Sequence, residues 1–244
     1  MDKMVRGLVN MIFPARCPIC DGILYEEEKS TGYCSACRKK IHFVGEKYCM
    51  KCGKPVGDND TEYCNDCNKT IHYYTENRAG YIYEGDIKRA MYRFKYMNRR
   101  DYGIAFTRDI ERELGDYFNR ILSEGKIDAV MPIPMYPEKL RSRGYNQAER
   151  FAEAVGKTFG IPLVKNRLIR VKDTETMKLL SPEARRRNLN NAFQYIQTGV
   201  KLNRILLADD IYTTGATIDS ASKVLRSAGV SDIYSVCVCI GRVT

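Results

Sequence analysis

The sequence lacks several features that would assign a protein to well-known classes. Its 244 residues contain no apolar run near the roughly 20 residues that a membrane-spanning helix needs. The opening segment MDKMVRGLVNMIFPARC has a hydrophobic stretch that is too short and too charged for a secretory signal. We therefore expect a cytoplasmic protein, or one in an equivalent reducing compartment, without a transmembrane segment.

Two common phosphate-binding fingerprints are also missing. There is no G-x-G-x-x-G stretch, and GKT at 156–158 lacks the earlier glycine of a P-loop, because Phe151 holds that position. The charge nevertheless favours a polyanion, since lysines and arginines number 40 against 30 acids, a formal net charge of +10. This excess predicts attraction to nucleic acid, phosphorylated metabolites or anionic membranes.

Histidine is scarce and cysteine is abundant, which directs the search for metal ligands. Eight of the ten cysteines form four C-x-x-C pairs, and each pair can aim two thiolates at one ion. The pairs repeat as CPIC…CSAC and CMKCG…CNDC, a spacing typical of zinc ribbons. In a cytoplasmic protein this pattern indicates metal rather than disulfides, and a redox motif would need only one pair. The predicted ligands are Cys17, Cys20, Cys34, Cys37, Cys49, Cys52, Cys64 and Cys67.

Two pairings of these cysteines are open: sequential, with one zinc in each repeated half, or interleaved, as in cross-braced folds. We favour the sequential pairing because the two halves repeat. Four thiolates leave no open coordination position, so two structural zincs are expected to supply folding energy. His42 and His72 could serve as spare metal ligands, but the thiolates already suffice and we favour ordinary surface residues. We interpret Cys237 and Cys239 as buried small hydrophobes of a strand.

After the last pair the pattern changes to alternating helices and strands. We place the boundary between Thr70 and Tyr81, giving a cysteine-rich zinc-binding module over 1–72 and a second domain over 73–244. The alternation predicts an α/β fold whose mostly parallel sheet is flanked by helices and binds ligands at the carboxyl ends of its strands. Helices are expected around 110–121, 147–159 and 216–228 and after Ser181–Pro182; strands are expected at 127–134, 161–171, 192–196, 204–208 and 232–240.

The stretch ILLADDIYTTGAT at 205–217 is the most specific functional signal. A buried strand ending at Ala208 would deliver Asp209 and Asp210 to the ligand edge, where carboxylates accept hydrogen bonds from sugar hydroxyls. TTGAT would then open a helix and offer N–H groups and threonine hydroxyls to a phosphate, with Gly215 allowing close approach. The alternative is an acidic turn with a routine helix cap. The ordered combination favours a site for a ribose 5-phosphate.

This stretch resembles the phosphoribosyl-pyrophosphate (PRPP) signature of type I phosphoribosyltransferases, and the chain as a whole is similar to the ComF family of competence proteins. The resemblance includes MIFPARCPIC, the cysteine pairs, RFKY at 93–96, VMPIPMYPEKLRSRGYNQAE at 130–149 and RRRNLNNAF at 185–193. It implies a zinc module joined to a type I phosphoribosyltransferase-like domain. It also implies a role in natural transformation, during which single-stranded DNA enters the cytoplasm.

The resemblance further implies roles for individual residues. The two aspartates would hold the ribose hydroxyls and occupy the catalytic position, and the loop 213–217 would hold the 5-phosphate. Lys95, Arg143 and the turn from Pro132 to Pro134 would line the pyrophosphate side, with Mg²⁺ bridging pyrophosphate and ribose oxygens. The implied binding residues are Asp209, Asp210, Thr213, Thr214, Gly215, Ala216, Thr217, Lys95 and Arg143.

A basic stretch rich in aromatics, DIKRAMYRFKYMNRRDYG at 86–103, has two interpretations. Basic residues that track phosphates and aromatic rings that stack on bases would suit single-stranded DNA. The other interpretation is an amphipathic helix that turns Met91 and Phe94 to the core, and the run 185–187 has the same ambiguity. Three functions stay open: a phosphoribosyltransferase, a DNA-binding adaptor that only senses PRPP, and a salvage transferase. Competence-machinery proteins are further expected partners.

Overall fold

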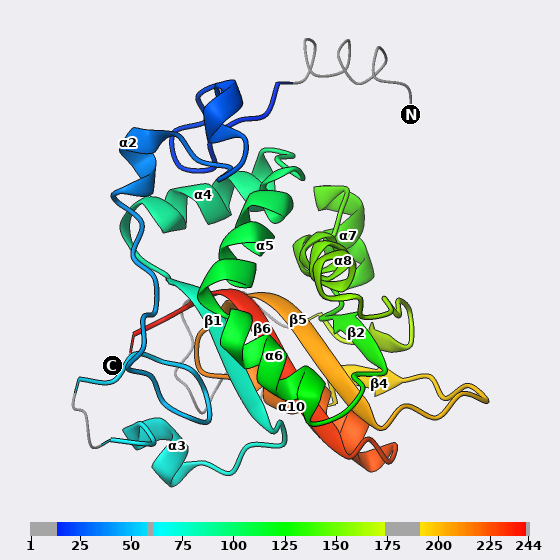
Figure 1. Ribbon diagram of the computed structural model, residues 1–244. Helices are drawn as coiled ribbons and strands as arrows, with labels where there is room; N and C mark the ends of the chain where they lie inside the picture. The colour runs from blue at the N-terminus through cyan, green and yellow to red at the C-terminus, as the bar shows by residue number, and fades with distance from the viewer. Residues whose placement is uncertain (1–13, 58–60, 174–190, 243–244) are drawn as a thin grey trace.

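The central sheet consists of four parallel strands in the order β1 (Glu76–Ile82), β6 (Asp232–Ile240), β5 (Arg204–Tyr212) and β2 (Ala129–Pro132). The computed structural model describes residues 14–57, 61–173 and 191–242 (Figure 1). A separate antiparallel pair joins β3 (Leu168–Arg170) to β4 (Phe193–Tyr195). The expected α/β class with a mostly parallel sheet is confirmed.

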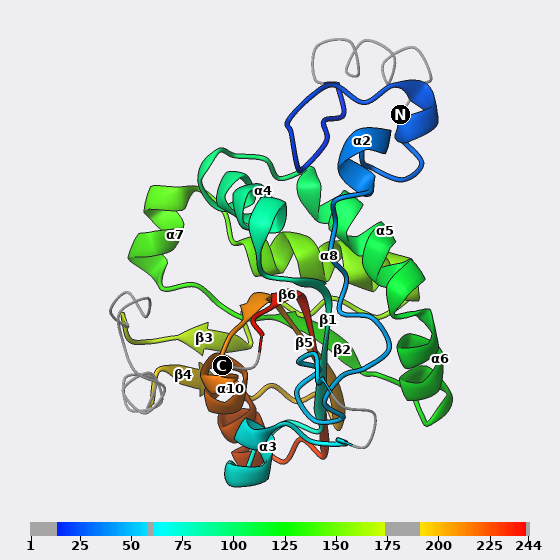
Figure 2. The same ribbon diagram turned by 90° about the vertical axis from the view of Figure 1, so that its left-hand side faces the viewer.

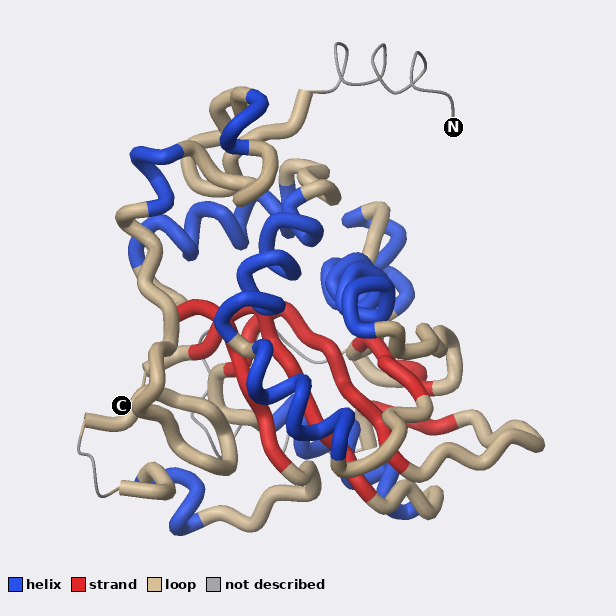
Figure 3. The backbone as a smooth tube through the Cα atoms, in the orientation of Figure 1, coloured by secondary structure: helices blue, strands red, loops and turns tan. Residues whose placement is uncertain are grey.

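Helices cover both faces of this sheet (Figure 3). Along β5, Leu206 and Ala208 pack with one group of helices, whereas the alternate residues Ile205 and Leu207 pack with α10. This alternation follows from the two-residue period of a strand, and a strand that is buried on both faces reads as a continuous apolar run. The helices are α4 (Gly85–Tyr96), α5 (Tyr102–Glu113), α6 (Gly115–Ser123), α7 (Pro137–Arg143), α8 (Gln147–Phe159) and α10 (Ala216–Ser227).

Several predicted boundaries are correct and three differ. The helix 147–159 and the final strand 232–240 match the structure, and Cys237 and Cys239 are buried as expected. The helix expected around 110–121 is two helices that break at Leu114, because Gly115 disfavours a helix interior. The strand expected over 161–171 is only β3, preceded by a single bridge between Leu163 and Val130. The helix start at Ser181–Pro182 lies outside the described residues.

The third difference concerns the aspartates themselves. Strand β5 does not end at Ala208 but continues to Tyr212, so Asp209 and Asp210 belong to the strand. Pairing with β6 extends to Tyr212 opposite Ile240 and holds Asp209 opposite Cys237. Aspartate has a low strand propensity, but a neighbouring strand with free backbone groups overrides it. The two carboxyl groups nevertheless have different environments, since Asp209 is buried whereas Asp210 is half-buried and pairs with Lys95.

The two cysteine-rich halves dock at different places on the sheet and its helices (Figure 2). We call residues 17–37 the first ribbon and residues 49–67 the second ribbon. The first ribbon, with α2 (Ser35–Arg38), packs beside α4 and α5, where Arg38 meets the fully buried Asp109 at 2.5 Å. The second ribbon, with α3 (Asn65–Lys69), packs on the face that carries α10, and Asn77 of β1 donates to the Cys52 carbonyl at 2.7 Å.

In the segments 14–57, 61–173 and 191–242, no helix has both the length and the apolar character needed to cross a membrane.

Candidate functional site

Each ribbon gathers four thiols at one point. Within each cluster the sulfur atoms lie within 4.8 Å of one another: Cys17, Cys20, Cys34 and Cys37 in the first ribbon, and Cys49, Cys52, Cys64 and Cys67 in the second. Zinc bound tetrahedrally at about 2.3 Å from each sulfur requires sulfur atoms about 3.8 Å apart. The sulfurs of Cys20 and Cys34 are 3.8 Å apart in the first ribbon, and those of Cys52 and Cys64 are 3.7 Å apart in the second. The geometry fits two structural zinc sites and confirms the sequential pairing.

The interpretation of the two histidines as surface residues is wrong for His72. The side chain of His42 is 64% exposed and bonds Glu84, but that of His72 is only 2% exposed. The Nε2 atom of His72 lies 3.5 Å from the Cys67 sulfur, and its Nδ1 atom lies 2.6 Å from an Asp219 oxygen. Sequence reasoning missed this residue because only the fold brings α10, which carries Asp219, to the second ribbon.

Near the end of β5, the structure joins the acidic pair to a lysine of α4. The Nζ atom of Lys95 lies 2.7 Å from a carboxylate oxygen of Asp210. Burial alone would lower the pKa of Lys95, but the attraction of Asp210 outweighs it and the pKa is raised. Asp210 thus holds a charged lysine at the ligand edge of the sheet.

Asp209 has a different environment from its neighbour. It is 9% exposed, and one of its oxygens accepts a hydrogen bond from the Asp210 N–H at 2.8 Å. Burial, followed by the like charge of Asp210, raises the pKa of Asp209 to about 8. The group is therefore mostly protonated at neutral pH in the absence of ligand, and an approaching cation or a network of donors would favour its ionised form.

The loop after β5 has the form expected of a phosphate cradle. Gly215 has a φ of 78°, in the left-handed region, and a Cβ atom there would collide with the Tyr212 hydroxyl. Helix α10 begins at Ala216, and its N-cap residue, Gly215, has no side chain with which to cap the first turn. Its N–H groups and positive end are therefore available to an anion. Thr213 is exposed, and Thr214 and Thr217 are half-buried beside it.

Two other predicted parts of the site are connected to the elements that carry the acidic pair and Lys95. Arg143 lies over the Tyr96 ring at 4.7 Å and donates to Gln147 at 2.8 Å, and Gln147 in turn bonds the Lys95 carbonyl. Beyond the turn that starts at Pro132, the Ile133 N–H donates to the Ala208 carbonyl at 2.9 Å. Arg143 is therefore connected to Lys95 through one intervening side chain.

Sequence reasoning did not find Arg170. This residue comes from β3, and it interacts electrostatically with Asp209 although burial lowers its own pKa. It also lines a cavity of about 150 Å³ between the end of β2, α7 and β3, together with Pro132 and Pro134. Its sequence context, a short strand, carries no motif, so only the tertiary fold reveals it as a cation at the site.

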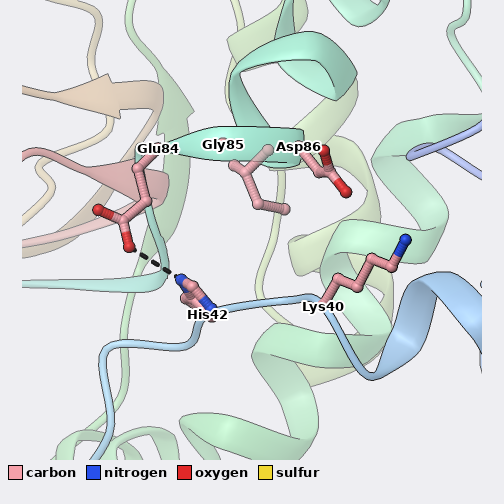
Figure 4. Close-up of a pocket in the computed structure, with 6 residues that line it drawn as sticks. Lys40, His42, Glu84, Gly85 and Asp86 are labelled. Atoms are coloured by element: carbon pink, nitrogen blue, oxygen red, sulfur yellow. Dashed lines mark hydrogen bonds and ion pairs between the residues drawn. The ribbon is translucent and has the colours of Figure 1, made fainter.

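A second pocket, of about 250 Å³, lies where the segment that follows the first ribbon passes the start of α4 (Figure 4). His42 and Glu84 face each other across it at 2.9 Å, and Arg242 donates two hydrogen bonds to Glu84. Arg242, with a smaller contribution from His42, lowers the pKa of Glu84 to about 2. None of the predicted binding residues lines this pocket, so we treat its ion pairs as structural.

The fold and the two thiol clusters define a protein with a double zinc ribbon followed by a parallel α/β sheet. The double zinc ribbon domain family matches residues 8–68. Competence protein F of Haemophilus influenzae is 31% identical over 244 aligned residues, which cover 91% of this chain and 95% of that protein. The chain belongs to the ComF family of competence proteins.

Other relatives agree with this assignment. Competence protein ComFC of Bacillus subtilis is 29% identical over 201 residues, covering 80% of this chain and 78% of that protein. DNA utilization protein YhgH of Salmonella typhi is 24% identical over 208 residues, covering 85% and 90% respectively. The similarity therefore extends well beyond the ribbons into the α/β sheet.

Proposed function

We propose that this chain binds PRPP with Mg²⁺ at the end of β5 and acts in the uptake or use of single-stranded DNA. The observation that carries the proposal is the ion pair of Asp210 and Lys95, in which a carboxylate oxygen and Nζ lie 2.7 Å apart. Asp210 also lies shortly before the start of α10 in the sequence. Vicinal carboxylates followed by an anion cradle match a ligand that has two hydroxyls near a phosphate. The names of the relatives, competence and DNA utilization proteins, support the cellular role.

In this proposal each part of the ligand has its own contacts. Asp209 and Asp210 accept hydrogen bonds from the ribose hydroxyls, and the loop 213–217 holds the 5-phosphate. Lys95 and Arg170 bring positive charge to the pyrophosphate, with Arg143 behind Lys95. Mg²⁺, which prefers carboxylate, phosphate and water oxygens, would neutralise the pyrophosphate. The turn after Pro132 forms the neighbouring wall of the site.

Two functions are compatible with this site, a phosphoribosyltransferase and a PRPP sensor. In a phosphoribosyltransferase, an acceptor nucleophile attacks the anomeric carbon, the bond to pyrophosphate breaks, and the nearby carboxylates stabilise the positive charge that develops on the ribose. In a sensor, PRPP binds and no bond breaks. A salvage transferase would additionally require a pocket for a free base.

Phosphorus NMR of Mg²⁺ and PRPP with the purified protein tests binding and turnover together. Broadened or shifted lines without new peaks would favour a sensor, and a pyrophosphate signal that appears with single-stranded DNA would favour a transferase. Asp210→Asn is the control, because it removes the partner of Lys95. Unchanged lines with the unmodified protein would refute PRPP binding.

We further propose that the outer face of α4 contacts single-stranded DNA. The core interpretation of this helix is confirmed for Met91 and Phe94, which are fully buried, but Tyr92 and Tyr96 are 60% and 54% exposed. Their rings lie 5.0 Å apart, and Arg143 covers one of them. Such a ring pair flanked by cations suits bases that stack while their phosphates are neutralised.

Fluorescence anisotropy with a labelled oligonucleotide tests this surface. Stacking contributes about 1–3 kcal/mol per base, so Tyr92→Ala with Tyr96→Ala should weaken binding at least about fivefold. Tyr25→Ala, which removes a still more exposed ring from the first ribbon, is the matched control. Equal affinity of both variants would refute the assignment of this surface.

The division into 1–72 and 73–244 and the cytoplasmic location stay predictions.

A further inference from the structure

The segment 72–74, which follows the second ribbon, is bonded to α10; we call these bonds the clamp. Helix α10 follows the loop 213–217, which we call the phosphate loop. His72 contacts Asp219 at 2.6 Å, and the Tyr73 N–H donates to the other Asp219 oxygen at 3.0 Å. Further along α10, Arg226 donates to the Tyr73 carbonyl at 3.0 Å. Asp219 lies in the first turn of α10, where its N–H donates to the Gly215 carbonyl at 2.8 Å. The clamp therefore acts on the turn that follows the loop.

The clamp also reaches the metal site. The other ring nitrogen of His72 lies 3.5 Å from the sulfur of Cys67, which is one of the four ligands of the second ribbon. Both neighbours of the ring, a zinc-bound thiolate and a carboxylate, are hydrogen-bond acceptors. A single buried imidazole therefore bridges a metal ligand and the start of α10. Contacts of this kind around a metal site orient its ligands.

The first ribbon offers an internal comparison. His42 stands five residues after Cys37 and His72 five residues after Cys67, and an isoleucine precedes each histidine. The two positions correspond in the repeat, but the His42 ring contacts Glu84 and its side chain is exposed. The link between imidazole and thiolate is thus a feature of the second ribbon and not of the repeat.

A second contact, made by Tyr74, connects the segment 72–74 to the strand side of the phosphate loop. Tyr74 shares a hydrogen bond with the Tyr212 hydroxyl at 2.7 Å, and the rings of His72 and Tyr74 lie 4.9 Å apart. The Tyr212 hydroxyl is also the group against which Gly215 packs. The segment 72–74 therefore supports the phosphate loop from the strand side through Tyr212 and from the helix side through Asp219.

We propose that His72 is a positioning residue that couples metal occupancy of the second ribbon to the conformation of the phosphate loop. The ligand affected is PRPP, so this inference rests on the proposed function. Coupling between two sites is reciprocal, so PRPP binding must stabilise the second zinc site as much as that zinc site favours PRPP. The first zinc site lacks this bridge and serves as the comparison.

The test uses the full-length, zinc-loaded chain, with a chelator and iodoacetamide present and peptide mass spectrometry as the readout. The alkylation rate of each cysteine then reports which ribbon has released its metal. Saturating PRPP with Mg²⁺ should slow alkylation of Cys64 and Cys67 about fivefold or more, the lower end of typical coupling. Cys20 of the first ribbon should react at an unchanged rate. In His72→Ala the protection by PRPP should disappear, whereas His42→Ala should behave like the unmodified chain.

Two further measurements keep the outcomes distinct. Calorimetry measures PRPP binding directly. If PRPP binds but does not protect Cys67, or protects it equally in His72→Ala, this inference is overturned and the proposed function stays intact. If PRPP does not bind, the proposed function fails. Hydrogen exchange over 213–219 then decides the coupling, since faster exchange in His72→Ala supports it and unchanged exchange overturns it. Asp219→Asn, which retains the contact between His72 and Cys67, replaces His72→Ala if that variant does not fold.

Discussion

Replacing Asp209 by asparagine should change how the stability of the protein depends on pH. The folded chain holds this carboxyl group in a buried place beside Asp210, which raises its pKa to about 8. In the unfolded chain an aspartate titrates near about 3.9. Asparagine has nearly the same shape and carries an oxygen that can still accept from the Asp210 N–H. The substitution therefore removes the titration and little else.

The sign and size of the effect follow from these two pKa values. Between about pH 4 and pH 8 the folded chain binds more protons at Asp209 than the unfolded chain, so stability falls as pH rises. Each unit of pKa difference corresponds to about 1.4 kcal/mol, which bounds the total at about 6 kcal/mol. Between pH 6.5 and 8.0 the unmodified chain should lose about 2 kcal/mol relative to Asp209→Asn. The carboxyl group that we propose to hold the ribose is thus kept at a cost in stability.

Urea unfolding of both proteins at these two pH values, with zinc in the buffer, measures the difference. The contribution of the thiolates to the pH dependence is common to both proteins and cancels. Asp210→Asn is the matched control: it leaves Lys95 without its carboxylate and should be destabilising at both pH values. If the free-energy gap between Asp209→Asn and the unmodified chain is the same at pH 6.5 and 8.0, Asp209 is not protonated in the folded state and the reasoning fails.

Three other predictions concern separate parts of the molecule. Elemental analysis should find about two zincs per chain and about one in Cys64→Ser, and the same content in both would refute the four-thiolate sites. Gly215→Ala should abolish PRPP binding in a titration, because its Cβ atom meets Tyr212, whereas Gly229→Ala, at a φ of 89° with open space around it, should bind normally. Asp109→Asn should lower the free energy of unfolding by about 3 kcal/mol in urea, because Arg38 loses its buried partner; a loss below about 1 kcal/mol would contradict this.

The sequence alone determined the parts of this protein that depend on local pattern. Four C-x-x-C pairs specified two sites, because a tetrahedral ion requires four close thiolates and the repeat groups them in order. Apolar runs between helical periods specified a parallel sheet, because a strand that is buried on both faces has few polar residues. The glycine of TTGAT specified a left-handed turn before α10.

The tertiary structure alone decided which of these pieces meet. Pairing with β6 extended β5 through Asp209 and Asp210 and so gave the two carboxyl groups unlike environments. Packing of the second ribbon against α10 buried His72 between Cys67 and Asp219, although its local sequence matches that of the exposed His42. Local sequence sets the geometry of a turn or a metal knuckle, but burial and charge depend on neighbours that are distant along the chain and become close only on folding.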